Sequence, residues 1–331
     1  MRRRPALLSA LTAAALVAVA LAGCAPQGRG PGNQPAGCTP DLPSGDASSV
    51  VKVSGASDAA PKASFPTPIV AKTSEVTVVK AGHGITAQKG STVVVDITVF
   101  DGRTGKSIGS TGYDGSSVVQ ALAGKGLPSQ QGGVQRSSIA DALVCAQAGS
   151  RIVLTSSNKR INAGLQGSTY GVAVIDVRSV YLPKADGVNQ LPKDGMPNVI
   201  TAVGGQPGVV VQELGKPTTA RSEVVKAGGG AVVTKKSTPV ILFRAWNWSG
   251  DKPTVVTALD TWSTGVASPV SLGAQGGLPP KLSSALVGQK VGSQVLVVLP
   301  PKDGFGAAGS NYGLTDKDTL IFVVDIVGVQ K

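Results

Sequence analysis

Runs of β-branched apolar residues, bounded by Gly, Pro or Asp, recur along the chain and are typical of β-strands. The predicted strands are residues 92–100, 151–156, 172–180, 240–248, 293–299 and 319–329. Two short segments, residues 138–146 and 280–287, fit helices instead, and the second of them opens just after Pro279. The pattern therefore predicts an α+β fold, in which a short helix crosses an antiparallel sheet.

The order of these runs occurs twice in the chain. Residues 78–84, Val-Val-Lys-Ala-Gly-His-Gly, recur as residues 224–230, Val-Val-Lys-Ala-Gly-Gly-Gly. The ends repeat as well, because Val-Ile-Asp-Val at 174–177 matches Val-Val-Asp-Ile at 323–326. We therefore predict two units, residues 46–182 and 195–331, each with one short helix. A linker rich in Pro, Gly and Lys, residues 183–194, joins them.

The N-terminal segment is predicted to be a targeting signal rather than a part of the fold. Arg2, Arg3 and Arg4 precede an apolar run that ends in Leu-Ala-Gly before Cys24, which is typical of a secretory signal peptide over residues 1–23. The segment resembles the bacterial lipobox, which implies cleavage before Cys24 and lipidation of its sulfur. Residues 24–45 then form a flexible tether that holds the protein at the extracytoplasmic face of the cell membrane. The alternative is an ordinary signal peptide with an incidental Cys.

Composition and charge exclude several classes of function. The 331 residues carry a net charge of +12, which falls to +9 without the signal arginines, but the basic residues are scattered. We therefore expect no nucleic-acid partner, and attraction to anionic lipid or wall polymers is the simpler interpretation. One His and three Cys are too few for the usual zinc sites, and nucleophilic catalysis would need His83. We expect neither a metal nor another cofactor.

The two remaining cysteines suggest a cross-link. Outside the cell a free exposed thiol is a liability, so Cys38 in the tether and Cys145 in an apolar segment are predicted to form a disulfide. The alternative is a buried, unreactive Cys145 with a free Cys38.

The second unit also carries a specific set of motifs: Gly228-Gly229-Gly230, Leu259-Asp260-Thr261, Val287-Gly288-Gln289-Lys290-Val291-Gly292, Leu299-Pro300-Pro301, Phe305-Gly306 and the strand that ends at Asp325. With these motifs it resembles the FKBP-type peptidyl-prolyl cis-trans isomerases, over residues 224–331 and more weakly over residues 76–180. The resemblance implies two FKBP-like units, each an antiparallel sheet wrapped on one short helix. A lipobox before tandem units is similar to the FKBP lipoproteins of Gram-positive bacteria.

The same resemblance implies the site. It assigns catalytic roles to Asp260, Phe305 and Phe322, and substrate binding to Phe243, Leu259, Leu278 and Leu282. Leu282 stands where the family usually has a Trp, Leu259 replaces a Phe, and Phe305 replaces a Tyr and so lacks its hydroxyl. We expect peptide binding to survive these changes better than turnover. The alternatives are that the apolar members are ordinary core residues and that Asp260 is a solvated turn residue.

The first unit departs further from the family. Its counterparts are Ile97, Ile139, Gly109 in place of the Asp, and Ala173 in place of Phe322, so we expect it to be inactive. We therefore predict a monomeric, membrane-anchored isomerase that assists the folding of exported proteins, with prolyl-containing polypeptides as partners. The competing hypotheses are a degenerate protein that binds prolyl peptides without catalysis, and an envelope lipoprotein that only docks to a partner.

Overall fold

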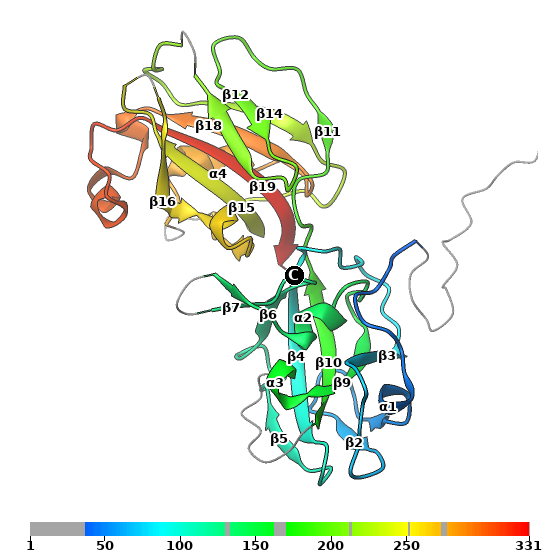
Figure 1. Cartoon of the computed structure of the whole chain (residues 1–331). Helices are drawn as coiled ribbons and strands as arrows, with labels where there is room; N and C mark the ends of the chain where they lie inside the picture. Colours follow the sequence, from blue (N-terminus) through cyan, green and yellow to red (C-terminus); the bar gives the residue numbers. More distant parts are fainter. Residues whose placement is uncertain are drawn as a thin grey trace, which may run out of the picture.

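The structure is a computed structural model that describes residues 37–129, 133–161, 170–211, 214–250, 252–272 and 277–330 (Figure 1). The predicted signal peptide, Cys24 and the first part of the predicted tether lie outside these residues. In the part of the chain that is described, no helix is long and apolar enough to cross a membrane.

The first unit is built on an antiparallel sheet in which the described strands follow the order β3-β9-β10-β4-β5, with β6 also paired to β4. The strands are β3 (Glu75–Lys80), β4 (Thr92–Asp101), β5 (Ser107–Ser110), β6 (Val119–Leu122), β9 (Arg151–Ser157) and β10 (Tyr170–Val180). A separate small hairpin joins β7 (Leu127–Pro128) to β8 (Val134–Gln135).

Both faces of this sheet are covered, which explains why its central strands are almost continuously apolar. Alternate residues of β10 point to opposite faces, so Ala173 and Ile175 pack toward α2 (Ser138–Ala142), and Val172 and Val174 pack toward the opposite face. That opposite face is covered by α1 (Asp46–Ser49) and by the hairpin of β1 (Lys52–Ser54) and β2 (Lys62–Ser64). A short helix, α3 (Asn158–Ile161), follows β9, so the described part of the first unit has three short helices and the prediction of one was wrong.

The second unit repeats this plan with a sheet whose described strands follow the order β11-β14-β18-β19-β15-β16, with β17 paired to β15. The strands are β11 (Val188–Asn189), β14 (Arg221–Ala227), β15 (Thr238–Asn247), β16 (Thr254–Asp260), β17 (Ser268–Pro269), β18 (Gln294–Leu299) and β19 (Leu320–Gln330). α4 (Pro280–Leu286) packs on one face, and the hairpin of β12 (Asn198–Thr201) and β13 (Pro207–Val210) covers the other. The 3-10 turns η1 (Thr261–Ser263), η2 (Pro301–Asp303) and η3 (Gly306–Tyr312) complete the unit.

Each predicted strand overlaps an observed one, with ends that differ by at most two residues. The helix predicted over residues 138–146 is shorter, because α2 ends at Ala142. Three residues later the chain has left the helix: Cys145 has a φ of 69°, in the left-handed region, and its N–H donates to Ala87 O at 2.9 Å. The second predicted helix, residues 280–287, ends one residue early at Leu286.

The structure corrects the expected boundaries on both sides of the first unit. The end of the predicted tether is fixed, since Pro43 O accepts the Val76 N–H and Cys38 forms a disulfide with Cys145 whose Cα atoms lie 5.7 Å apart. The predicted linker, residues 183–194, contains β11, which pairs with β14. A linker that contributes a strand belongs to the second sheet.

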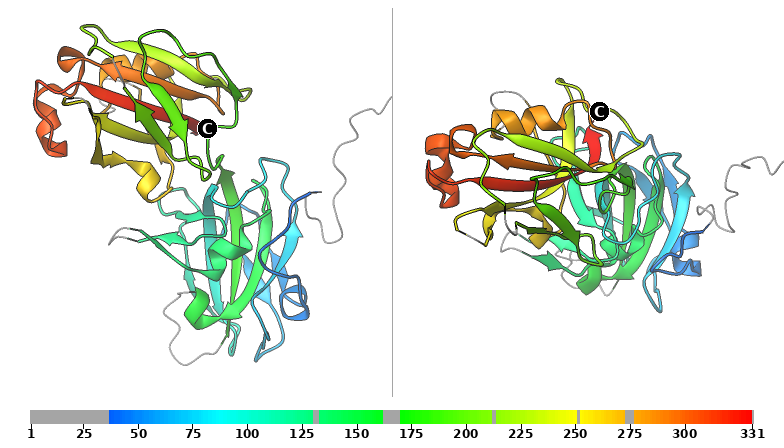
Figure 2. Two further views of the ribbon diagram at one scale, coloured as in Figure 1. Left: turned by 45° about the horizontal axis from the view of Figure 1, so that its top comes forward. Right: turned by 90° about the horizontal axis from the view of Figure 1, so that it is seen from above.

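The two units touch where β10 leaves the first sheet (Figure 2). A buried cluster at this junction joins Tyr181 to Leu242, Ala267 and Val327 of the second unit. Two hydrogen bonds cross the same region, from Leu182 N to Val327 O and from Ala267 N to the Thr92 hydroxyl, each at 3.0 Å. The sequence alone gave no indication of this contact.

Candidate functional site

The structure brings together the six apolar residues that the resemblance assigned to a cup. All six belong to the core on the α4 side of the second sheet: Phe243 on β15, Leu259 on β16, Leu278 just before α4, Leu282 within it, Phe305 just before η3 and Phe322 on β19. Leu259, Leu282 and Phe322 are buried, and the other three are half-buried. The cluster therefore has a buried floor and a partly open rim.

An aromatic residue that the sequence analysis missed completes this rim. Tyr312, at the end of η3, places its ring 4.9 Å from that of Phe305, which in turn lies 6.2 Å from the ring of Phe322. Such tilted ring pairs add to the energy of apolar burial. Tyr312 is half-buried, and it supplies near Phe305 the phenolic hydroxyl that Phe305 itself lacks. The only signal in the sequence was its aromatic character within a stretch rich in Gly and Ala.

Asp260 directly follows the cup residue Leu259 on β16, but its side chain is bonded to residues outside the cup. Its carboxylate accepts a hydrogen bond from Arg244 Nη2 at 2.7 Å and caps η1 by accepting the Trp262 N–H at 3.0 Å. Phe243 precedes Arg244 on β15 and faces the α4 core, so strand alternation places Arg244 on the opposite face. The side chain of Asp260 is only 6% exposed, which excludes the alternative of a solvated turn residue. Its catalytic role stays a prediction.

The three tryptophans lie away from the cup. Trp246 and Trp248 pack in the core on the hairpin side of the sheet, and strand alternation places them opposite Phe243. Trp262 packs against the cluster at the junction of the two units.

The first unit has a cavity of about 320 Å³ at the place that corresponds to the cup. Three of its predicted counterparts, Ile97, Gly109 and Ile139, line it, and the fourth, Ala173, is buried in the core beside them. The remaining lining residues are aliphatic or small and polar: Val99, Ser110, Thr111, Ser117, Val119, Leu127 and Ile161. No aromatic side chain is among these lining residues, which are all in the described part of the chain.

The opposite face of each sheet carries a buried carboxylate with a different partner in each unit. In the first unit Asp176 pairs with Arg151, whose Nε and Nη2 lie 2.8 and 3.0 Å from the carboxylate oxygens. In the second unit Asp325 occupies the matching strand position and faces Gln294, whose Nε2 donates to it at 2.7 Å. Burial raises the pKa of Asp325 to about 6, although the charges of Lys226 and Lys184 act in the opposite direction.

Among the described residues, His, Cys, Asp and Glu nowhere gather in a group of three that could hold a metal ion. What the cup offers is therefore apolar enclosure, aromatic faces and one phenol. Such a site can bind an apolar ring and polarise one carbonyl group.

Comparison with known proteins agrees with the position of the cup. Residues 259–327 match the family model for FKBP-type peptidyl-prolyl cis-trans isomerase. This segment runs from Leu259 on β16 to β19 and contains five of the six cup residues together with Asp260 and Tyr312. No curated protein matches the sequence.

Several solved structures are similar at low scores. The three FKBP domains of wheat FKBP73 align with 78% of this chain and 95% of theirs, at 14% identity and a TM-score of 0.29. Escherichia coli FkpA aligns with 42% of this chain and 53% of its own, at 23% identity and a TM-score of 0.29. The N-terminal domain of Arabidopsis thaliana FKBP42 aligns with 43% of this chain and 99% of its own, at 20% identity and a TM-score of 0.31. Scores this low carry no argument of their own.

Residues 259–327 of the second unit therefore match an FKBP-type peptidyl-prolyl cis-trans isomerase domain. This assignment rests on the family match over residues 259–327 and supports peptidyl-prolyl cis-trans isomerase activity for the protein.

Proposed function

We propose that the protein is a membrane-anchored, extracytoplasmic prolyl isomerase that assists the folding of exported polypeptides through its second unit. The observation that carries this proposal is the aromatic cluster within the segment that matches the isomerase family, in which Phe305 and Tyr312 form the rim and Phe322 the floor. The first unit is proposed to be a degenerate copy of the same domain.

The chemistry requires no nucleophile. An X–Pro amide rotates slowly because resonance gives its C–N bond partial double-bond character, with a barrier of about 18–20 kcal/mol. An apolar enclosure disfavours the charge-separated resonance form of the planar amide, so it binds the twisted amide more tightly than the planar one. In this proposal the proline ring lies against Phe305 and Phe322, and the Tyr312 hydroxyl donates to the carbonyl before proline. Arg244 and Asp260 hold the end of β16, and thereby Leu259, in place.

A protease-coupled assay with a prolyl tetrapeptide tests the activity on the chain from residue 25 onward, which contains every described residue. We expect acceleration above the uncatalysed rate, and Phe305→Ala should lower kcat/KM at least tenfold. Phe65→Ala is the matched control, because Phe65 is a half-buried Phe of the first unit that also contacts a second aromatic ring. Absence of acceleration by the unaltered chain would refute the proposal.

The location is supported by the disulfide between Cys38 and Cys145, because such bonds persist in oxidising compartments outside the cytosol. The sequence before Cys24 supplies the proposed anchor. Mass analysis of the N-terminus of the protein from membranes should find a diacylglyceryl group on Cys24. A chain cleaved elsewhere, or a Cys24 without lipid, would remove the anchor from the proposal.

A second candidate function is favoured by one observation, the aliphatic cavity of the first unit. Without an aromatic face it can enclose an apolar side chain but offers no phenol for a carbonyl. Under this proposal the first unit holds client segments while the second isomerises them. Val119→Trp, which fills the cavity, should weaken the binding of a prolyl peptide without lowering kcat for a short tetrapeptide. Unchanged peptide affinity would leave the first unit with a purely structural role.

A further inference from the structure

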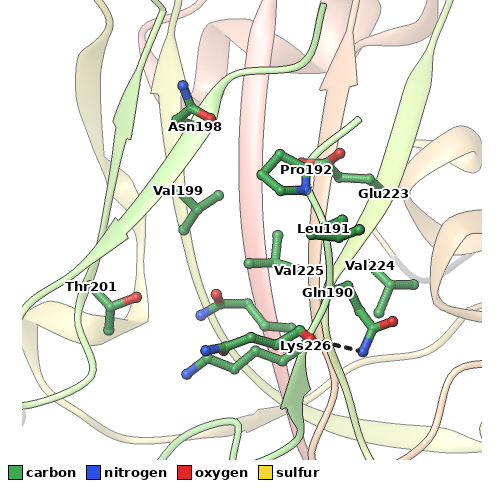
Figure 3. A pocket seen from close by; sticks show the side chains of 12 residues that line it. Gln190, Leu191, Pro192, Asn198, Val199, Thr201, Glu223, Val224, Val225 and Lys226 are labelled. Carbon is green, nitrogen blue, oxygen red and sulfur yellow. Dashed lines mark hydrogen bonds between the residues drawn. The ribbon is translucent and has the colours of Figure 1, made fainter. Parts of the chain in front are cut away.

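The second unit has a cavity of about 410 Å³ on the face of its sheet opposite the cup (Figure 3). It lies between β14, the segment Asn189–Pro192 and the hairpin strand β12. Figure 3 shows Asn198, Val199 and Thr201 of the hairpin on one side and Glu223 and Val224 of β14 on the other. Its volume is within the range of small-ligand sites.

One wall of this cavity carries a buried acceptor without a partner. Gln294 is 1% exposed, and its Nε2 donates to Asp325, which leaves Oε1 without a hydrogen bond in the described part of the chain. A buried carbonyl left unpaired costs about 1–3 kcal/mol. Lys226 lines the same cavity, and within the described residues its ammonium group makes one long hydrogen bond, of 3.4 Å, to Ala185 O. An ammonium group has three donors, so Lys226 has donors left for a ligand.

The internal repeat identifies what fills this place in the first unit. The paired residues Lys226, Gln294 and Asp325 correspond to Lys80, Arg151 and Asp176, because the strand pairings and the bulge between them are the same in both sheets. Arg151 donates to two main-chain carbonyls of the first unit's own hairpin, Gly55 O at 2.8 Å and Ala56 O at 2.7 Å. Lys80 donates to the hydroxyl of the next residue, Ser57, at 3.1 Å.

The first unit also has a helix where the second has none. Its α1 lies against β3 and β9 and buries Ala47 and Ser48. At the same distance from the repeated motif, the second unit has the irregular segment 192–195. In both units the segment at this place is bonded to the sheet, since Ser48 N donates to Glu75 Oε2 in the first unit and Lys193 N donates to Glu223 Oε2 in the second. The units differ in the hairpin: its turn is bonded to Arg151 and Lys80 in the first unit, whereas the described hairpin residues of the second unit make no bond to Gln294 or Lys226.

From this comparison we propose that the cavity is a second polypeptide-binding site, which takes an extended segment with small side chains from a partner protein. The segment replaces the main chain that Arg151 and Lys80 hold in the first unit. It donates a backbone N–H to Gln294 Oε1 and presents a carbonyl or hydroxyl oxygen to Lys226 Nζ. Val199 and Val225 contact its side chains. The change from Arg to Gln reverses the polarity at this point, so the ligand must bring a donor rather than an acceptor.

A proline-free probe separates this site from the cup. The probe is a fluorescein-labelled, acetylated and amidated peptide with the sequence of residues 51–58, Val-Lys-Val-Ser-Gly-Ala-Ser-Asp. Anisotropy titration of the chain from residue 25 onward should show saturable binding. Because the peptide has no proline, its binding does not depend on isomerase activity.

The decisive variant is Gln294→Arg, which gives the second unit the ion pair of the first and fills the open space. We expect at least tenfold weaker binding. Gln289→Arg, the same substitution at a half-buried residue of this unit that does not line the cavity, is the matched control and should bind normally. Should Gln294→Arg fail to fold, Thr201→Arg, at an exposed hairpin position, blocks the cavity from the other side. Equal affinity of the folded variant and the unaltered chain, or absence of saturable binding, would overturn the proposal.

Discussion

The buried carboxyl group of Asp325 should make the stability of the second unit depend on pH. Its side chain is 1% exposed, accepts hydrogen bonds from Ala185 N and Gln294 Nε2, both at 2.7 Å, and has a pKa raised by burial to about 6. The ordinary value is 3.8. The folded second unit thus keeps a proton on this carboxyl group at pH values where the unfolded chain has lost it.

The sign and size of the effect follow from this difference. Between about pH 4 and pH 6 the folded state binds more protons than the unfolded state, so the free energy of unfolding falls as pH rises. A difference of about two pKa units corresponds to roughly 3 kcal/mol, which is lost by pH 7. Asp325→Asn removes the charge and retains an acceptor for Ala185 N. Its new amide N–H groups can donate to Gln294 Oε1 once that side chain rotates. We therefore expect the variant to unfold at a higher denaturant concentration than the unaltered chain at pH 7, and to lose this advantage near pH 4.

Tryptophan fluorescence is the appropriate measurement, because all three tryptophans lie in the second unit, with Trp246 and Trp248 in its core and Trp262 at the junction of the two units. Urea titrations at several pH values from 4 to 8 give the difference between variant and unaltered chain, from which other titrating groups cancel. Asp316→Asn, at an exposed residue, is the control and should not change the profile. If the difference in stability between Asp325→Asn and the unaltered chain is constant from pH 4 to 8, the pKa of Asp325 is not raised in the folded state and the reasoning is refuted.

Three further outcomes are expected. Tyr312→Phe should lower kcat/KM for prolyl tetrapeptides about three- to tenfold with little change in stability, and an unaltered rate in the coupled assay would mean that its hydroxyl does not contact the substrate. Replacing both Cys38 and Cys145 by Ser opens a loop of 107 residues and should lower the free energy of unfolding by up to about 5 kcal/mol in denaturant titrations followed by far-ultraviolet circular dichroism. Arg151→Met leaves Asp176 buried without its cation and should destabilise the first unit by about 3–5 kcal/mol, which the same titrations measure; Arg103→Met, at an exposed residue, should have no such effect.

The parts of the fold that could be predicted from the sequence are the central strands, where residues of one kind follow one another in a regular pattern. The central strands are continuous runs of β-branched residues because both of their faces are buried, so their bounds were predicted to within two residues. The two hairpins on the outer faces were not predicted. Strand β1 is Lys-Val-Ser and β12 is Asn-Val-Ile-Thr, with mostly exposed residues, and segments this short have no detectable period.

The same limit applies to the candidate site. The apolar cup could be assigned because the motifs of the second unit resemble those of a known family, and four of its six residues lie on regular strands or on α4. The pairing of Asp260 with Arg244 could not, because an irregularity in the register between β15 and β16 decides which residues meet. Tyr312 is brought to Phe305 by the 3-10 turn η3, whose course depends on packing rather than on periodicity.

The two units differ in a consistent direction on both faces of the sheet. In the first unit the cup has no aromatic lining, while the outer face is closed by the bonds of Arg151 to Asp176 and to the hairpin. In the second unit the aromatic rim is present, and on the outer face the described residues supply neither an ion-pair cation for Asp325 nor a donor for Gln294 Oε1. The buried Asp325 and the unpaired Gln294 Oε1 both lower the stability of the second unit. The first unit shows that the same fold can instead hold an ion pair between Arg151 and Asp176 at these positions. Proteins depart from such consistent packing mainly at functional sites, so the loss of stability on the outer face is itself an argument that a ligand binds there.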